Sequence, residues 1–224
     1  EVEGNIMSLI YGDDFKNNST ISSGYTFEGL FRGCAKLVSA ENLVLPATTL
    51  TDYCYRSMFS NCTSLTVAPA LPATTLGSEC YKGMFDGCIS LTQAPALPAT
   101  TLKSECYAGM FGGCTKLTAA PALPATTVPW GCYKGMFVAC HSLTTAPELP
   151  ATTLSERCYD EMFRNCTSLN YIKCLATDIS TTYGCTNNWV WGVASTGTFV
   201  KASSMKSWKR GDDGIPTRWA IRNE

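Results

Sequence analysis

Apolar residues follow a fixed pattern over most of the chain. Residues 54–62 read Cys-Tyr-Arg-Ser-Met-Phe-Ser-Asn-Cys, and similar blocks follow at steps of 26 residues. Within a block the apolar positions stand at offsets 0, 1, 4, 5 and 8 from the first cysteine, with a leucine at offset 11. Spacings of three and four residues place side chains on one face of a helix. We therefore predict a short helix or helical turn in residues 54–62, 80–88, 106–114, 132–140 and 158–166.

A second repeated segment lies between these blocks. Residues 65–76 read Leu-Thr-Val-Ala-Pro-Ala-Leu-Pro-Ala-Thr-Thr-Leu, and the segment returns from residues 91, 117 and 143 with few changes. Its composition indicates a short extended stretch closed by proline. A proline inside a strand gives up one ladder hydrogen bond. We therefore predict very short or irregular strands around Pro69, Pro95, Pro121 and Pro147.

Helical blocks that alternate with extended segments predict an α/β repeat solenoid. A period of about 20–29 residues with leucine at set positions is typical of leucine-rich-repeat arrays. We expect a right-handed, curved array, because strands stack at ~4.8 Å whereas packed helices need ~8–10 Å. The array of about six coils is expected over residues 26–191, since outer coils are degenerate copies that shield the core. Residues 1–25 are expected to form an N-terminal cap, and residues 192–224 a small β-rich C-terminal cap.

Composition narrows the classes of function. The 224 residues include 17 basic and 18 acidic side chains, a net charge of −1, which gives no electrostatic support for a nucleic-acid partner. A single histidine and the lack of a convergent nucleophile and base indicate no enzyme activity, no catalytic residues and no metal or cofactor. No apolar run is long enough to span a membrane. The chain starts at Glu1 without a leader, so we expect a processed or excised protein whose signal or anchor lies elsewhere.

Thirteen cysteines need a structural account. Two cysteines eight residues apart on one helix would lie ~12 Å from each other, beyond the ~7 Å limit for a disulfide. Their spacing is also unlike that of a zinc site. We therefore expect small buried thiols in two core columns. Cys174 and Cys185 break the column pattern, and they either form a disulfide or remain free.

The repeat resembles a known family. The motif Met-Phe-x-x-Cys-x-Ser-Leu-Thr-x-Ala-Pro-x-Leu-Pro-Ala-Thr-Thr-Leu is similar to that of BspA-like leucine-rich-repeat surface proteins of gut and oral bacteria, which have Ala-Phe-x-x-Cys at the corresponding place. The resemblance covers roughly residues 26–190. It implies an exported protein of the outer cell surface or extracellular space, with a curved solenoid used for adhesion or ligand binding and no shared catalytic residues.

The candidate binding residues are those that differ between otherwise uniform copies. The position after Leu-Thr varies strongly, and charged residues gather in the last coil. Such positions are expected to be exposed, and they form either a binding groove on the strand face or ordinary solvated surface. Trp130 is a further candidate, because exposed aromatic rings often contact partners. The candidate ligand-binding residues are therefore Gln93, Trp130, Thr145, Glu148, Tyr171 and Lys173.

Two functions are consistent with these features. The first is a non-catalytic interaction protein that adheres to a glycan or protein of a host or neighbouring cell through the solenoid surface. The alternative is a structural spacer or stalk that presents another domain, which near-identical repeats with alanine and proline at variable positions also favour. A binding site confined to the last coil would favour the interaction protein over the spacer.

Overall fold

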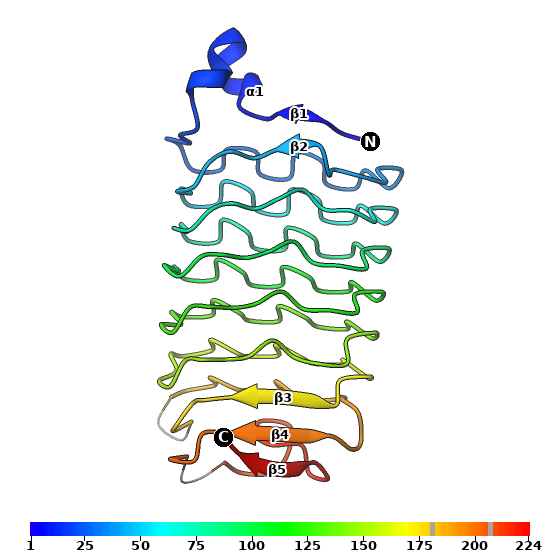
Figure 1. Ribbon diagram of the computed structural model, residues 1–224, viewed down its shortest axis with the longest axis vertical. Coiled ribbons are helices and arrows are strands. Elements are labelled where there is room, and N and C mark those ends of the chain that lie inside the picture. The colour runs from blue at the N-terminus through cyan, green and yellow to red at the C-terminus, as the bar shows by residue number, and fades with distance from the viewer. Residues whose placement is uncertain (180–181, 206–207) are drawn as a thin grey trace.

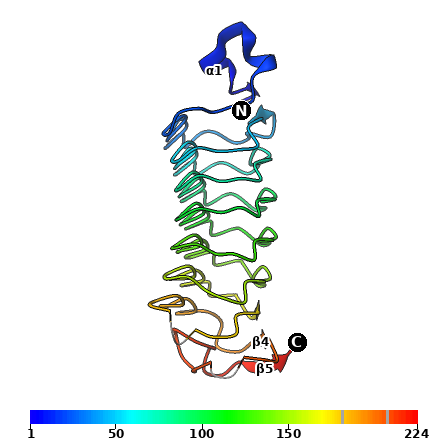
Figure 2. The ribbon, with the colours of Figure 1, turned by 90° about the vertical axis from the view of Figure 1, so that its left-hand side faces the viewer.

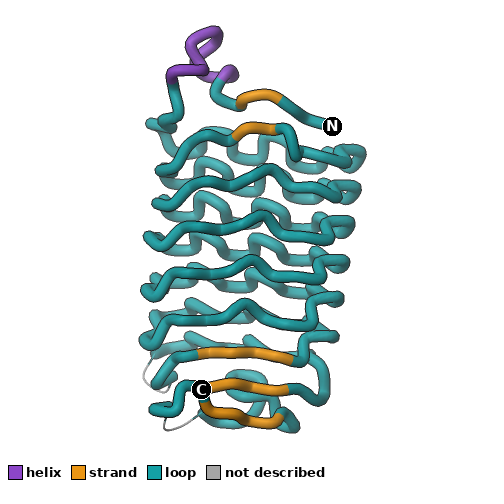
Figure 3. Tube along the Cα trace, in the orientation of Figure 1, coloured by secondary structure: helices purple, strands orange, loops and turns teal. Residues whose placement is uncertain are grey.

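The chain forms a column of stacked coils (Figure 1). The computed structural model describes residues 1–179, 182–205 and 208–224. Most of each coil consists of turns and extended segments, and the regular strands lie at the two ends of the column (Figure 3). The elements are β1 (Gly4–Asn5), α1 (Ser8–Tyr11), the 3-10 helix η1 (Gly12–Asn17), β2 (Leu43–Val44), β3 (Tyr171–Cys174), β4 (Thr198–Lys201) and β5 (Ala220–Asn223).

Backbone hydrogen bonds join each coil to the next and confirm the 26-residue repeat. The N–H of Tyr55 donates to the carbonyl oxygen of Cys80 over 3.0 Å, and Tyr81 donates in the same way to Cys106. The series continues through Tyr107 and Tyr133, and Tyr159 donates to Cys185 over 2.9 Å. We call the side of the column formed by these cysteine-containing blocks the turn side.

The opposite side of the column, the strand side, is built from parallel pairings. Isolated bridges join Ser39 to Val67, Gln93 to Ala119 and Thr145 to Tyr171. Among the described residues, these pairings lengthen into strands at the two ends of the column. At one end β1 pairs with β2, and at the other β3, β4 and β5 form a three-stranded parallel sheet.

The helices predicted in the repeated blocks are wrong. On the turn side the backbone becomes left-handed at every fourth residue, with φ of 52° at Glu79, 60° at Gly83 and 73° at Gly87. A left-handed residue ends a right-handed helix. In residues 81–87, moreover, alternate N–H groups donate to the next coil over 2.7–3.0 Å instead of within the segment. Each block is therefore a run of tight turns, and the repeat combines turns with short extended segments, not the predicted α/β units.

Because the turn-side blocks are hydrogen-bonded to one another, the reason for expecting a curved array no longer applies. We predicted a wide helical side and a narrow strand side. The stacked rings on the turn side are instead 5.6–6.0 Å apart from Tyr55 to Tyr159 and from Phe59 to Phe163. The backbone is hydrogen-bonded between coils on both sides. On both sides the spacing between neighbouring coils is therefore about that of one hydrogen-bonded layer, and the coils stack as a column (Figure 2).

Two aromatic ladders and two cysteine columns fill the interior. One ladder runs through the tyrosines of the blocks and the other through the phenylalanines, and both end on the buried indole of Trp189. The cysteines at both block positions are buried free thiols from Cys54 to Cys166, which confirms the predicted thiol columns. Each thiol of the second column donates to a phenylalanine carbonyl of the preceding coil, as Cys88 does to Phe59 over 3.1 Å.

The two ends of the column differ. At the N-terminal end α1 and η1 project beyond the first coil, as Figure 2 shows. At the C-terminal end Trp219 is buried and its indole N–H donates to the carbonyl oxygen of Ala194 over 2.8 Å, which fixes the tail to the last coil. Among the described residues, no helix has the length and apolar character needed to cross a membrane.

Candidate functional site

The turn side carries a charged ladder through the first coils. Basic residues at the third block position, Arg56 and Lys82, alternate there with Glu79 and Glu105, each of which precedes a block. The guanidinium of Arg56 lies 3.4 Å from the carboxylate of Glu79, and the same carboxylate lies 2.9 Å from the ammonium of Lys82. Lys82 also bonds to Glu105 in the next coil. These charges therefore compensate one another.

The pattern changes in the last coils. Arg157 stands where earlier copies have Glu79 and Glu105, and Asp160 stands where three earlier copies have Arg56, Lys82 and Lys134. Asp160 is buried and accepts a hydrogen bond from the amide of Asn187 over 3.0 Å, while Lys134 lies 3.3 Å from its other oxygen. The local charge ladder is therefore reorganised around an acid held between two coils.

The C-terminal tail folds against these coils. The hydroxyl of Thr186 donates to the carbonyl oxygen of Asp213 over 2.9 Å, and the indole N–H of Trp189 donates to Gly214 over 2.8 Å. Trp208 packs on Trp189, with ring centroids 5.4 Å apart. The tail is thereby fixed against the end of the aromatic core.

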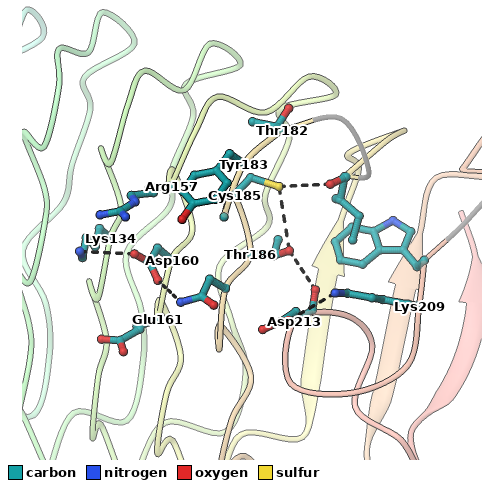
Figure 4. Close-up of a pocket in the computed structure, with 14 residues that line it drawn as sticks. Lys134, Arg157, Asp160, Glu161, Thr182, Tyr183, Cys185, Thr186, Lys209 and Asp213 are labelled. Atoms are coloured by element: carbon teal, nitrogen blue, oxygen red, sulfur yellow. Dashed lines mark hydrogen bonds and ion pairs between the residues drawn. The ribbon is translucent and has the colours of Figure 1, made fainter.

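A large cavity of about 1200 Å³ lies between the coils and the tail (Figure 4). We call it the C-terminal pocket. One wall comes from the turn side of the last coils and the other from the tail, and residues before Cys185 line it between them. Its lining includes Lys134, Arg157, Asp160, Glu161, Thr182, Tyr183, Cys185, Asn187, Trp208, Lys209 and Asp213.

Cys185 is an unsuitable nucleophile despite its place in the pocket. Burial is the main cause that raises the pKa of its thiol, so the thiolate is disfavoured at neutral pH. Its sulfur lies 3.6 Å from the carbonyl oxygen of Ile179 and donates to it. Within the described residues, no group of three or more His, Cys, Asp or Glu side chains is arranged to hold a metal ion.

The disulfide considered for Cys174 and Cys185 is not formed in the structure. Both residues are buried free thiols. Burial also raises the pKa of Cys174 to about 12. Cys185 continues the series of first block cysteines, because the N–H of Tyr159 donates to its carbonyl oxygen, whereas Cys174 lies in β3 on the strand side.

The structure brings four of the six predicted binding residues together. Thr145 pairs with Tyr171 across adjacent coils of the strand side. The ammonium of Lys173 lies 3.0 Å from the carboxylate of Glu148 and 2.7 Å from that of Glu224. Lys173 is thus held by two carboxylates, and its charge is already compensated.

The other two predicted residues lie apart from this cluster. Gln93 is exposed and pairs with Ala119, two coils away from Thr145. Trp130 is 40 % exposed, and its carbonyl oxygen accepts from the N–H of Glu105 at the start of a turn-side block. The predicted residues therefore do not form a single site.

Sequence reasoning did not find the C-terminal pocket. Two of its residues, Arg157 and Tyr183, stand in the variable segment that precedes a block. Arg157 occupies the repeat position that holds glutamate in two earlier copies, and Tyr183 occupies the repeat position of Trp130. That change of residue type was a usable signal. The contribution of Trp208, Lys209 and Asp213 could not be found from the sequence, because the folding of the tail brings these residues to the turn side.

Comparison with known proteins gives one similarity of fold. No protein-family model matches the chain, and no curated protein matches it. A leucine-rich repeat protein from Bacteroides ovatus ATCC 8483, known from its crystal structure, is similar with a TM-score of 0.43 and 17% sequence identity. The similarity covers 88% of this chain and 56% of that one, so the chain spans little more than half the length of that protein.

Proposed function

We propose that the chain is a non-catalytic recognition module that binds a glycan or protein of a host or neighbouring cell in the C-terminal pocket. The pocket itself carries the proposal. It is large, it is lined by polar, charged and aromatic side chains, and it lies where Arg157 and Asp160 reverse the charges that Glu79 and Lys82 carry at the same repeat positions.

The chemistry of the pocket supports binding over catalysis. The thiol of Cys185 is buried and protonated at neutral pH. The chain has one histidine, His141, which is not among the residues that line the pocket. A nucleophile with an adjacent base, which covalent catalysis needs, is not found among the lining residues.

The resemblance of the repeat motif to BspA-like surface proteins supports the setting that we propose. In that setting the protein is exported and acts at the outer cell surface or in the extracellular space.

A structural spacer is the second candidate, and one observation favours it. Hydrogen bonds join the coils on both sides of the column, and nearly identical aromatic ladders run through it. Such an array extends by identical layers and is suited to holding another domain at a distance.

Binding to an array of host glycans and matrix proteins separates the two candidates. The full chain is compared with Asn187→Trp, which fills the pocket from an exposed position, and with a Tyr171→Ala, Lys173→Ala variant on the strand side. Saturable binding that Asn187→Trp abolishes and the strand-side variant retains supports the pocket. Binding lost only in the strand-side variant moves the site there, and no binding at high protein concentration favours the spacer.

A further inference from the structure

We propose that the C-terminal pocket binds an acidic saccharide whose carboxylate is received by the guanidinium of Arg157. The inference rests on the proposed function, because it names the ligand class of the same pocket. It follows from three features: an uncompensated charge, an exposed aromatic ring beside that charge, and a wall whose backbone N–H groups at Arg157, Tyr159 and Glu161 are already hydrogen-bonded.

Arg157 supplies the uncompensated charge. The other cations of the pocket wall and one adjacent cation already bind carboxylates at 2.7–3.3 Å, in the pairs Lys134–Asp160, Lys209–Asp213 and Arg164–Glu161. Within the part of the chain that the structure describes, no carboxylate forms an ion pair with Arg157. The free positive charge of the pocket is therefore at Arg157, and it favours an anionic group of the ligand.

The position of Arg157 suits a carboxylate in particular. The guanidinium carbon lies 5.8 Å from the centre of the Tyr183 ring, so an aromatic face supports the cation. A guanidinium has five donors around a planar rim, which matches the two oxygens of a carboxylate. Tyr183 is 73 % exposed, so its ring offers an apolar surface next to the proposed ion pair.

The remaining features favour a saccharide. A sugar ring presents apolar C–H groups to an aromatic ring such as that of Tyr183, and hydroxyl groups to polar side chains. The Asn187 amide already donates to Asp160 and the Thr182 hydroxyl to Leu154, so the side-chain oxygens of both residues remain to accept hydrogen bonds from sugar hydroxyls. The cavity of about 1200 Å³ exceeds the usual ~300–1,000 Å³ of a small-molecule site, so it has room for more than one ring.

An extended peptide finds little support on the same wall. Peptides that add to a sheet edge need free backbone N–H and carbonyl groups. On this wall the N–H groups of Arg157, Tyr159 and Glu161 already donate to the next coil over 2.8–3.3 Å. Recognition must therefore come from side chains, which the carboxylate and hydroxyls of an acidic sugar can satisfy.

The test is calorimetric titration of the full chain with defined acidic sugars. The probes are trigalacturonate and sialyllactose, which carry the same carboxylate chemistry from two sources. Their neutral counterparts are methyl-esterified trigalacturonate and lactose. We expect saturable binding of at least one acidic probe, about tenfold or more tighter than that of its neutral counterpart, and weaker at higher salt.

Three variants locate the interaction. Arg157→Gln removes the charge, and Arg157→Lys keeps the charge but not the planar fork. Arg56→Gln is the matched control, because Arg56 also lies over a tyrosine ring, 5.7 Å from the centre of Tyr53, but on the distant first coils. We expect a loss of about tenfold or more in Arg157→Gln, a smaller loss in Arg157→Lys and none in Arg56→Gln.

The outcomes separate this inference from the proposed function. Equal binding of acidic and neutral sugars, unchanged affinity in a folded Arg157→Gln variant, or no binding of either acidic probe each overturns the inference. If Asn187→Trp still abolishes binding of another partner, the pocket remains the proposed recognition site although its ligand is not an acidic saccharide. Far-ultraviolet circular dichroism and thermal unfolding check that each variant remains folded.

Discussion

The thiol of Cys114 donates a hydrogen bond to the carbonyl oxygen of Phe85 in the preceding coil, with 3.2 Å between sulfur and oxygen. The same relationship joins Cys88 to Phe59, Cys140 to Phe111 and Cys166 to Phe137. The second cysteine of each block is therefore a link between coils as well as a small core residue. This explains why a thiol, and not an alanine, stands there in the five complete copies, from Cys62 to Cys166.

Replacing this cysteine is expected to weaken the column. Cys114→Ala removes a buried hydrogen bond and leaves a small cavity, so the free energy of unfolding should fall by about 1–3 kcal/mol. Urea unfolding of the variant measures this loss. Cys34→Ala is the control, because Cys34 is exposed and should change stability by no more than about 0.5 kcal/mol. Equal stability of the two variants would contradict the linking role.

The reactivity of the thiols should reflect their burial. All thirteen cysteines are free, and all but Cys34 are buried. A thiol reagent at pH 8 should therefore modify one cysteine in the native chain and all thirteen after unfolding in urea without reductant. Fewer than thirteen reactive thiols after unfolding would mean that disulfides exist. Rapid modification of many thiols in the native chain would mean that the columns are open.

Stability should fall in alkaline solution. Burial raises the pKa of Cys54, Cys88 and Cys106 from 9.0 to about 12. The unfolded chain releases these protons near pH 9 whereas the folded chain keeps them, so stability present below about pH 9 is lost as the pH rises toward 12. Unfolding midpoints at pH 7, 8, 9 and 10, measured under reducing conditions, should stay level and then decline. A midpoint unchanged to pH 10 would show that the thiols ionise alike in both states.

The tyrosine ladder carries hydroxyl groups that gain nothing from burial. The phenol oxygens of Tyr55, Tyr107, Tyr133 and Tyr159 are buried and have no hydrogen-bond partner among the described residues. Tyr107→Phe keeps the stacked ring, 5.9 Å from each neighbouring ring, and removes an unsatisfied polar group. We expect a free energy of unfolding that is unchanged or about 1 kcal/mol higher, as measured by urea unfolding.

Tyr107→Ala provides the contrast for this measurement. It removes the ring itself and should cost about 3–5 kcal/mol. A Tyr107→Phe variant that loses more than about 1 kcal/mol would contradict the account, since it would mean that the hydroxyl has a stabilising partner such as a buried water.

The sequence allowed the repeat and its core to be predicted, but not the local backbone. The 26-residue step and the buried columns follow from positions such as Cys88 and Cys114, which recur in register. The predicted helices were wrong because apolar offsets of 0, 1, 4, 5 and 8 were treated as a helical period near 3.6. The offsets instead repeat every four residues, and residues with positive φ such as Gly83 and Gly87 stand at the same interval.

The strand-side cluster was predicted from the sequence, but the C-terminal pocket was not. The proximity of Glu148 and Lys173 followed from two charged residues in adjacent coils at nearby positions of the repeat. The C-terminal pocket depends on the tail, where Asp213 meets Thr186 across the last coil. The tail lies outside the repeat, so no periodic pattern places it. Arg157 was visible as a change of charge, but its freedom from an ion pair appears only in the folded chain.

Hydrogen–deuterium exchange with a partner found on the array examines whether the C-terminal pocket is the recognition site. We expect slower exchange, on addition of the partner, in peptides that contain Arg157, Tyr183 and Lys209, and no change at Tyr171 and Lys173. Slower exchange confined to the strand side around Tyr171 would contradict the claim, as would a bound partner that leaves exchange in the pocket unchanged.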